Sequence, residues 1–171
     1  AKYGKARIAL PGGCAIGSRP VNYHLDSLRQ MGAEIVLKNG YIEASAKNLQ
    51  GAIIRFDGVS VTGTENLMMA ATLAEGTTTL LNVAREPEVA DLANMLNSMG
   101  AKIDGAGSDE ITIQGVKKLS GTSFQIPADR IEAGTYLAAA AVTKGDIKIE
   151  GINPNRLMNV IDKLIHTSAK V

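Results

Sequence analysis

The sequence predicts an α+β protein made of pseudo-symmetric β-α-β-β-β-α units, with buried helices rich in Ala, Leu and Met. Two observations carry this prediction. The sequence matches itself at a period of 67 to 69 residues, so that Met31-Gly32-Ala33 recurs as Met99-Gly100-Ala101. Within each copy, β-branched runs alternate with segments whose apolar residues recur every three or four positions, which is the spacing of a helix.

The first helix type follows three regularly spaced prolines. Pro20, Pro87 and Pro154 each precede an amphipathic stretch, and proline is favoured at the first helical position. Gly32 and Gly100 follow the first two stretches, where a left-handed C-terminal cap favours glycine. We therefore expect helices over 21–31, 89–99 and 157–164.

β-branched runs before and after these helices predict short strands. One strand is expected before each helix, and a hairpin with a glycine turn is expected after the first two. The expected segments are Arg7–Leu10, Thr77–Leu81 and Asp146–Ile149 before the helices, and Glu34–Leu37 with Tyr41–Ala44 and Lys102–Ile103 with Glu110–Ile113 after them.

A second helix type is expected over 65–75 and 130–144. Thr62 to Glu65 and Asp129 to Glu132 have the spacing of a capping box, and Gly76 and Gly145 are expected to close the two helices. Both helices are apolar nearly all round, so we expect burial on every side. Two such helices cannot enclose each other, and the chain is therefore expected to be a fragment cut within a unit at both ends.

Composition excludes several classes of protein. The chain has 18 Lys plus Arg and 17 Asp plus Glu, a net charge of +1, so no basic footprint for nucleic acid is expected. No uncharged run is longer than Ala133–Thr143, which is shorter than the roughly 20 residues of a membrane span, so a cytoplasmic protein without a membrane partner is expected. One Cys and two His exclude an internal disulfide and a four-ligand zinc site.

The connection over 11–20 contains the residues best suited to chemistry. Cys14 lies among three glycines and five residues before Arg19, at the start of a helix. A nearby Arg and a helix N-terminus lower a thiol pKa from its usual value of about 8.5, so Cys14 could donate a proton near neutral pH. A small buried apolar residue is the alternative interpretation.

Equivalent positions in the repeats differ in chemistry. Arg19, Glu86 and Asn153 each precede a proline, which suggests a composite site at helix N-termini, and Arg19 suits an anionic substrate. Solvated turn residues are the alternative interpretation for Arg19 and Glu86. Asp129 is the expected N-cap of its helix, and a half-exposed helix histidine such as His24 is more often structural than catalytic.

Four stretches, 11–20, 70–78, 84–88 and 129–135, are similar in order and spacing to the bacterial UDP-N-acetylglucosamine enolpyruvyl transferase family. The resemblance implies an inside-out α/β barrel fold of two domains, each with three units around buried helices. It covers the middle of such an enzyme. Residues 1–127 correspond to the later part of the first domain, and 128–171 to the start of a unit of the second.

The resemblance also implies an activity. The family transfers the enolpyruvyl group of phosphoenolpyruvate to the 3′-hydroxyl of UDP-N-acetylglucosamine and releases phosphate, the first committed step of peptidoglycan synthesis, without metal or organic cofactor. Cys14 matches the proton donor that the antibiotic fosfomycin alkylates. Arg19 matches a residue that holds phosphate or carboxylate.

Further site residues are carried over by the same resemblance. Two segments match nucleotide-binding stretches, His24 and Glu86 match polar residues that line the site, and Asp129 matches a carboxylate near the reaction centre. The two segments are Arg19-Pro20-Val21-Asn22-Tyr23 and Gly58-Val59-Ser60-Val61. Gly58 stands where some members carry Lys, and Asn22 where some carry Asp. An N-terminal Lys-Asn pair, a later carboxylate and several arginines are missing, so the chain alone is expected to be inactive.

Two alternative functions follow from the same architecture. A 5-enolpyruvylshikimate 3-phosphate synthase-like enzyme shares the phosphoenolpyruvate chemistry but lacks the Pro-Gly-Gly-Cys loop that contains Cys14. A non-catalytic repeat scaffold predicts interchangeable turns, whereas the turns of this chain differ and only one is expanded.

Overall fold

The computed structural model describes residues 2–10, 12 and 21–171 of the chain, which divide into two compact units. Unit 1 spans 1–124 and unit 2 spans 125–171. That they belong to two different domains of a longer protein stays a prediction.

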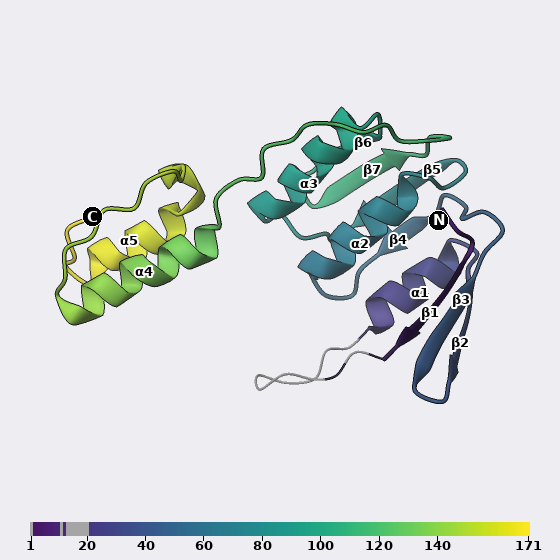
Figure 1. Cartoon of the computed structure of the whole chain (residues 1–171), viewed down its shortest axis with the longest axis horizontal. Helices are drawn as coiled ribbons and strands as arrows, with labels where there is room; N and C mark the ends of the chain where they lie inside the picture. Colours follow the sequence, from purple (N-terminus) through teal and green to yellow (C-terminus); the bar gives the residue numbers. More distant parts are fainter. Residues whose placement is uncertain (1, 11, 13–20) are drawn as a thin grey trace. The chain divides into compact units, whose positions relative to one another are not determined.

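Unit 1 begins with an antiparallel sheet beside one helix (Figure 1). The strand order is β1-β3-β2, and a tight turn joins β2 to β3. Asn39 and Gly40 form this turn with φ of 50° and 76°, the left-handed pair that a two-residue hairpin requires. The elements are β1 (Lys5–Ala9), α1 (Asn22–Gln30), β2 (Glu34–Lys38) and β3 (Tyr41–Ser45).

The second sheet of unit 1 has four strands in the order β4-β5-β7-β6. β4 pairs parallel with β5, and the other pairs are antiparallel. α2 and α3 pack on this sheet (Figure 1). The elements are β4 (Ile53–Arg55), α2 (Val61–Ala71), β5 (Thr77–Leu81), α3 (Pro87–Ser98), β6 (Lys102–Asp104) and β7 (Glu110–Gln114).

The first predicted β-α-β-β-β-α unit is confirmed as β1-α1-β2-β3-β4-α2. Both predicted glycine caps are also confirmed, because Gly32 and Gly100 have φ of +87° and +98°. The next amide in each copy bonds back to the helix, from Ala33 to the Leu28 carbonyl and from Ala101 to the Leu96 carbonyl. This is the bond pattern that left-handed glycine caps make.

The start predicted for α2 is wrong. The helix begins at Val61, and its N-cap is Ser60, whose Oγ accepts a hydrogen bond from the Gly63 amide at 3.1 Å. The helix ends at Ala71, ahead of the expected Glu75. Ser60 is extended (φ −139°, ψ 115°), which suits a capping residue better than the helical Thr62 that the sequence suggested.

Unit 2 consists of α4 (Arg130–Thr143), a short 3-10 turn (Pro154–Arg156) and α5 (Met158–His166). The C-cap of α4 is Lys144 rather than the expected Gly145, and Lys144 takes the left-handed conformation with φ of 55°. Pro154 opens the 3-10 turn, and α5 begins four residues after it.

The strand expected over Asp146–Ile149 is not formed, and neither is the fourth strand of the second unit, which the repeat predicts between β7 and α4. A strand needs a hydrogen-bonded neighbour, and no segment of 125–171 adopts β structure beside it. The described residues likewise form no closed barrel.

The core of unit 1 lies between the helices and the four-stranded sheet. α2 contributes Leu67, Met68 and Ala71 to it, but Met69 is 46% exposed, so the helix is not buried on every side. α4 departs further from that expectation, because only Ala133 and Gly134 are buried. Within unit 2, α5 packs against one side of α4. In the described part of the chain, no helix is both long and apolar enough to cross a membrane.

Candidate functional site

The N-terminal ends of α1, α2 and α3 lie toward one edge of unit 1. The three helices run side by side in the same direction, with α2 in contact with both neighbours (Figure 1). The first amides of a helix lack intrahelical partners, and the helix dipole adds positive potential there. The edge therefore presents three sets of oriented N–H donors to an anionic ligand.

His24, in the first turn of α1, is tied to α2. Its Nδ1 lies 2.9 Å from the Nδ2 of Asn66. The imidazole is half-buried, and this burial lowers its pKa from the ordinary value of 6.5, so the neutral ring is favoured. Asn66 has no signal in the sequence, because the two residues are 42 positions apart.

Two segments expected to bind a nucleotide meet in the structure. A Cβ placed on Gly58 would lie 2.9 Å from the hydroxyl oxygen of Tyr23. The Tyr23 ring packs edge-on against Phe56, with centroids 6.0 Å apart. The Tyr23 hydroxyl thus occupies the space beside Gly58 that a side chain at that position would need.

The other residues of the two segments have distinct surroundings. Val59 is exposed, Val61 packs partly against the core, and the Ser60 hydroxyl accepts the capping bond of α2. Val21 is the N-cap residue of α1 without a capping side-chain bond, and Asn22 is exposed at its first position.

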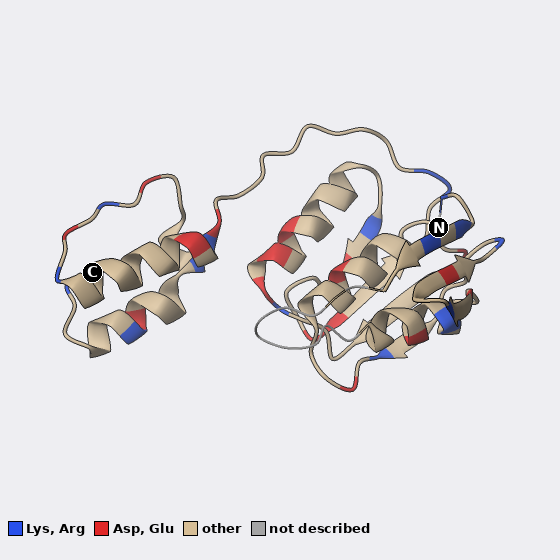
Figure 2. Cartoon of the chain, turned by 60° about the horizontal axis from the view of Figure 1, so that its bottom comes forward, with Lys and Arg blue, Asp and Glu red and all other residues tan. Residues whose placement is uncertain are grey.

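Carboxylates open α3 (Figure 2). Glu86 is its N-cap residue, makes no side-chain capping bond and is half-buried. Glu65 of α2 lies near these carboxylates. Partial burial, then the negative charges of Glu88 and Glu86, raise the pKa of Glu65 from its ordinary value of 4.5. In the sequence, Glu65 has only the spacing of a capping box, and no local pattern indicates that it lies near the carboxylates at the start of α3.

Asp129 lies in unit 2, as the N-cap of α4. Its Oδ1 accepts hydrogen bonds from the Ile131 and Glu132 amides at 2.8 and 3.1 Å. This confirms the capping role expected from the sequence, and a part in the reaction stays a prediction. Cys14, Arg19 and Pro20 lie outside the described residues.

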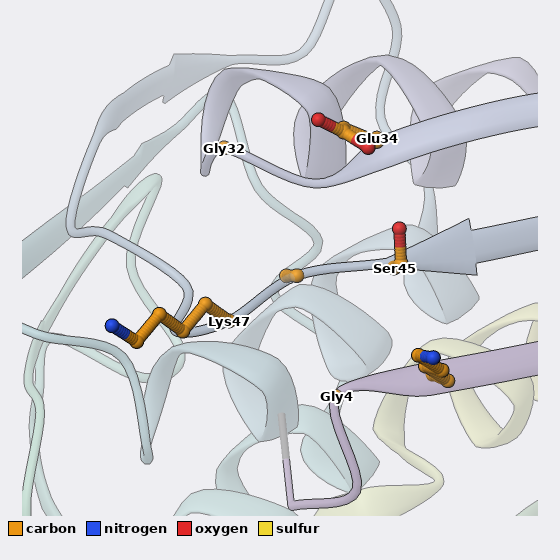
Figure 3. A pocket seen from close by; sticks show the side chains of 7 residues that line it. Gly4, Gly32, Glu34, Ser45 and Lys47 are labelled. Atoms are coloured by element: carbon orange, nitrogen blue, oxygen red, sulfur yellow. The ribbon is translucent and has the colours of Figure 1, made fainter.

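A surface hollow of about 460 Å³ lies away from these residues (Figure 3). Gly32, just past the C-terminal end of α1, lines it together with Glu34, Ser45 and Lys47. It thus adjoins the end of α1 opposite to His24 and contains none of the predicted site residues. Among residues that the structure describes, no group of three or more His, Cys, Asp or Glu could hold a metal ion.

Known proteins that match the whole chain are carboxyvinyltransferases. The model of the family described as EPSP synthase (3-phosphoshikimate 1-carboxyvinyltransferase) matches residues 1–171. UDP-N-acetylglucosamine 1-carboxyvinyltransferase of Hydrogenovibrio crunogenus is 56% identical over the whole chain, which covers 41% of that protein. The protein of the same name from Acidobacterium capsulatum is 57% identical over the whole chain, which covers 39% of it.

Among solved structures, EPSP synthase from Acinetobacter baumannii superposes with a TM-score of 0.69 at 25% identity, over 97% of this chain and 38% of that one. The fold is therefore that of an enolpyruvyl transferase. The chain spans about two fifths of the length of the curated relatives that it matches.

Proposed function

The chain belongs to the EPSP synthase family, and from this premise we propose that the full-length protein is a UDP-N-acetylglucosamine 1-carboxyvinyltransferase. It transfers the enolpyruvyl group of phosphoenolpyruvate to the 3′-hydroxyl of UDP-N-acetylglucosamine and releases phosphate. The observation that carries the proposal is the identity of 56% and 57% to relatives of that name along all 171 residues. Such a reaction belongs to cytoplasmic peptidoglycan synthesis.

The chemistry begins with a proton. Cys14 protonates the methylene carbon of phosphoenolpyruvate, which makes the neighbouring carbon an oxocarbenium-like centre. The 3′-hydroxyl of the sugar attacks that centre and loses its proton, giving a tetrahedral intermediate. Loss of a proton from the new methyl group and cleavage of the bond to phosphate then restore the enol ether and release phosphate.

The substrate's negative charge is held at the helix ends. Arg19 lies three positions before the first residue of α1 in the sequence, and an arginine guanidinium can bind phosphate or carboxylate in a bidentate manner. The amides at the ends of α1, α2 and α3 add uncharged donors near the same edge. His24 and Glu86 lie in the first turn of α1 and at the N-cap of α3, and by the resemblance they contribute polar groups to the substrate site.

The nucleotide lies along two segments. Pro20, Val21, Asn22 and Tyr23 form one, and Gly58 to Val61 form the other. The 2.9 Å approach between Tyr23 and the Cβ position of Gly58 supports a common surface for both segments. The Ser60 hydroxyl is already used as a helix cap, so Val59 and Ser60 contribute through the backbone.

In unit 2, Asp129 takes part in the reaction of the full-length protein, as the resemblance implies. In that role the carboxylate serves both the helix and the reaction, because its Oδ1 already accepts hydrogen bonds from the backbone amides of Ile131 and Glu132. A carboxylate with two such bonds retains lone pairs on its other oxygen.

The test uses the purified full-length protein. Phosphate release from phosphoenolpyruvate should depend on UDP-N-acetylglucosamine and not on shikimate 3-phosphate. The reverse dependence would assign the EPSP synthase reaction, and no release with either acceptor would contradict the proposal. The 171-residue chain measured in parallel is expected to be inactive, since it lacks part of the pocket.

A second test addresses Cys14 directly. Fosfomycin should alkylate Cys14 of the full-length protein, and Cys14→Ser should abolish the adduct seen by peptide mass spectrometry. An adduct on any other residue would show that the proton donor is misassigned.

A further inference from the structure

The contact between His24 and Asn66 determines which ring nitrogen of His24 carries the proton. A carboxamide nitrogen carries two hydrogens and no lone pair, so it can only donate. The Nδ2 of Asn66 lies 2.9 Å from Nδ1 of His24. Nδ1 must therefore accept, which leaves the proton of the neutral ring on Nε2.

Burial of the ring favours the same neutral state of His24 as this hydrogen bond. The half-buried imidazole loses solvation when it is charged, and its pKa is lowered for that reason. A cationic ring would also have a hydrogen on Nδ1, facing the hydrogens of the amide. Both effects favour one state, a neutral ring with a single donor at Nε2.

We infer that Asn66 is a positioning residue that holds His24 as the neutral Nε2–H tautomer, so that His24 offers an uncharged hydrogen-bond donor at the site edge. The use of that donor on a substrate oxygen rests on the proposed function, whereas the tautomer does not. Asn66 lies on the neighbouring helix α2 and acts on the site through His24.

The second histidine of the chain provides an internal comparison. Nδ1 of His166 lies 2.6 Å from the backbone carbonyl oxygen of Asp162. A carbonyl oxygen only accepts, so Nδ1 of His166 carries a hydrogen. The two histidines of the chain are thus expected to have opposite tautomers.

The tautomers can be read by nuclear magnetic resonance of the ¹⁵N-histidine-labelled 171-residue chain at about pH 8.5, about two units above the usual imidazole pKa. Protonated and unprotonated ring nitrogens have well-separated shifts. We expect the proton of His24 on Nε2 and that of His166 on Nδ1. A proton on Nδ1 of His24 would overturn the inference, and this measurement needs no variant.

A substitution tests whether Asn66 is the cause. Asn66→Asp keeps the size of the side chain but replaces the donor by an acceptor, so His24 should change to the Nδ1–H form. Asn94→Asp introduces the same charge at an exposed position of α3 and should leave His24 unchanged. An unchanged His24 tautomer in Asn66→Asp would overturn the assignment.

Kinetics of the full-length protein then separate this role from the proposed function. Loss of one neutral hydrogen bond should raise KM about fivefold to tenfold in Asn66→Asp, with Asn94→Asp unaffected. A reversed tautomer with unchanged kinetics would overturn the positioning role. Absence of activity in the unsubstituted protein would contradict the proposed function, while the resonance measurement would still decide the tautomer.

Discussion

Two fully buried threonines of unit 1 should respond in opposite ways to the same substitution. Thr64 and Thr78 are both 0% exposed. Thr64 Oγ1 donates to the Ser60 carbonyl at 2.8 Å and accepts from the Ala84 amide at 3.1 Å. Thr78 Oγ1 is buried without a hydrogen-bond partner. Valine replaces the hydroxyl by a methyl group of similar size in both cases.

The expected change in the free energy of unfolding follows from the hydrogen-bond partners of each threonine hydroxyl. Thr64→Val leaves the buried amide of Ala84 without this acceptor, and an unsatisfied buried polar group costs about 1–3 kcal/mol. The Ser60 carbonyl keeps its bond from the Thr64 amide, so the loss is confined to one donor. Thr78→Val removes a hydroxyl that lost its water on folding, and a gain of about 1–3 kcal/mol is expected.

The assay is urea unfolding of the 171-residue chain, followed through the amide resonances of β5 and β7. With an m-value of about 1.5 kcal/mol/M, a change of about 1.5 kcal/mol moves the midpoint by about 1 M. We expect a lower midpoint for Thr64→Val and a higher one for Thr78→Val. The Ala84 amide should also exchange faster in Thr64→Val. Shifts in the same direction would refute the reasoning from hydrogen-bond satisfaction.

Three further predictions concern the candidate site. Asp129→Asn retains a capping oxygen and should leave the helix content of α4 unchanged by circular dichroism, whereas Asp129→Ala should destabilise it by about 0.5–2 kcal/mol; equal losses in both would show that the charge itself holds the helix. Gly58→Ala should displace Tyr23, because the new Cβ lies 2.9 Å from its hydroxyl oxygen, and Tyr23→Phe should relieve the effect; tyrosine ring resonances that do not move in Gly58→Ala would contradict this. Partial burial, then the glutamates that open α3, raise the pKa of Glu65 above 4.5, so its contribution to stability is complete below pH 4.5 and is lost as pH rises through the raised value. Glu65→Gln should therefore stabilise unit 1 at neutral pH but not below pH 4.5 in urea unfolding, and a gain that persists in acid would contradict the electrostatic cause.

The sequence predicted most elements of unit 1 because their signals are local. The left-handed caps at Gly32 and Gly100 and the hairpin after each helix depend on neighbouring residues only. Thr77–Leu81 is a strand with the bounds that its β-branched run suggested. The start of α2 was misplaced because Thr62 and Ser60 both resemble caps, and only backbone conformation distinguishes them.

Elements that need a distant partner could not be predicted in this way. Asp146–Ile149 has the composition of a strand, but composition does not supply a neighbour to bond with. The apolar surface of α4 predicted burial on every side, while Val142 is 85% exposed. The pairing of His24 with Asn66 depends on how α1 packs on α2, so no short-range pattern encodes it.

The equivalent positions before the prolines show why a repeated fold need not be a repeated site. Asn153 precedes Pro154, and its Oδ1 accepts a hydrogen bond from the Asn155 amide at 3.0 Å, so this side chain serves its own turn. Glu86 precedes Pro87 in the other copy and makes no capping bond. Its carboxylate lies near the neighbouring helix α2, where partial burial, then Glu88, then Glu86 raise the pKa of Glu65. A scaffold whose turns were interchangeable would use this position in the same way in each copy. The difference between the copies favours a site assembled from chemically different residues at equivalent positions. The proposed transferase requires such an arrangement.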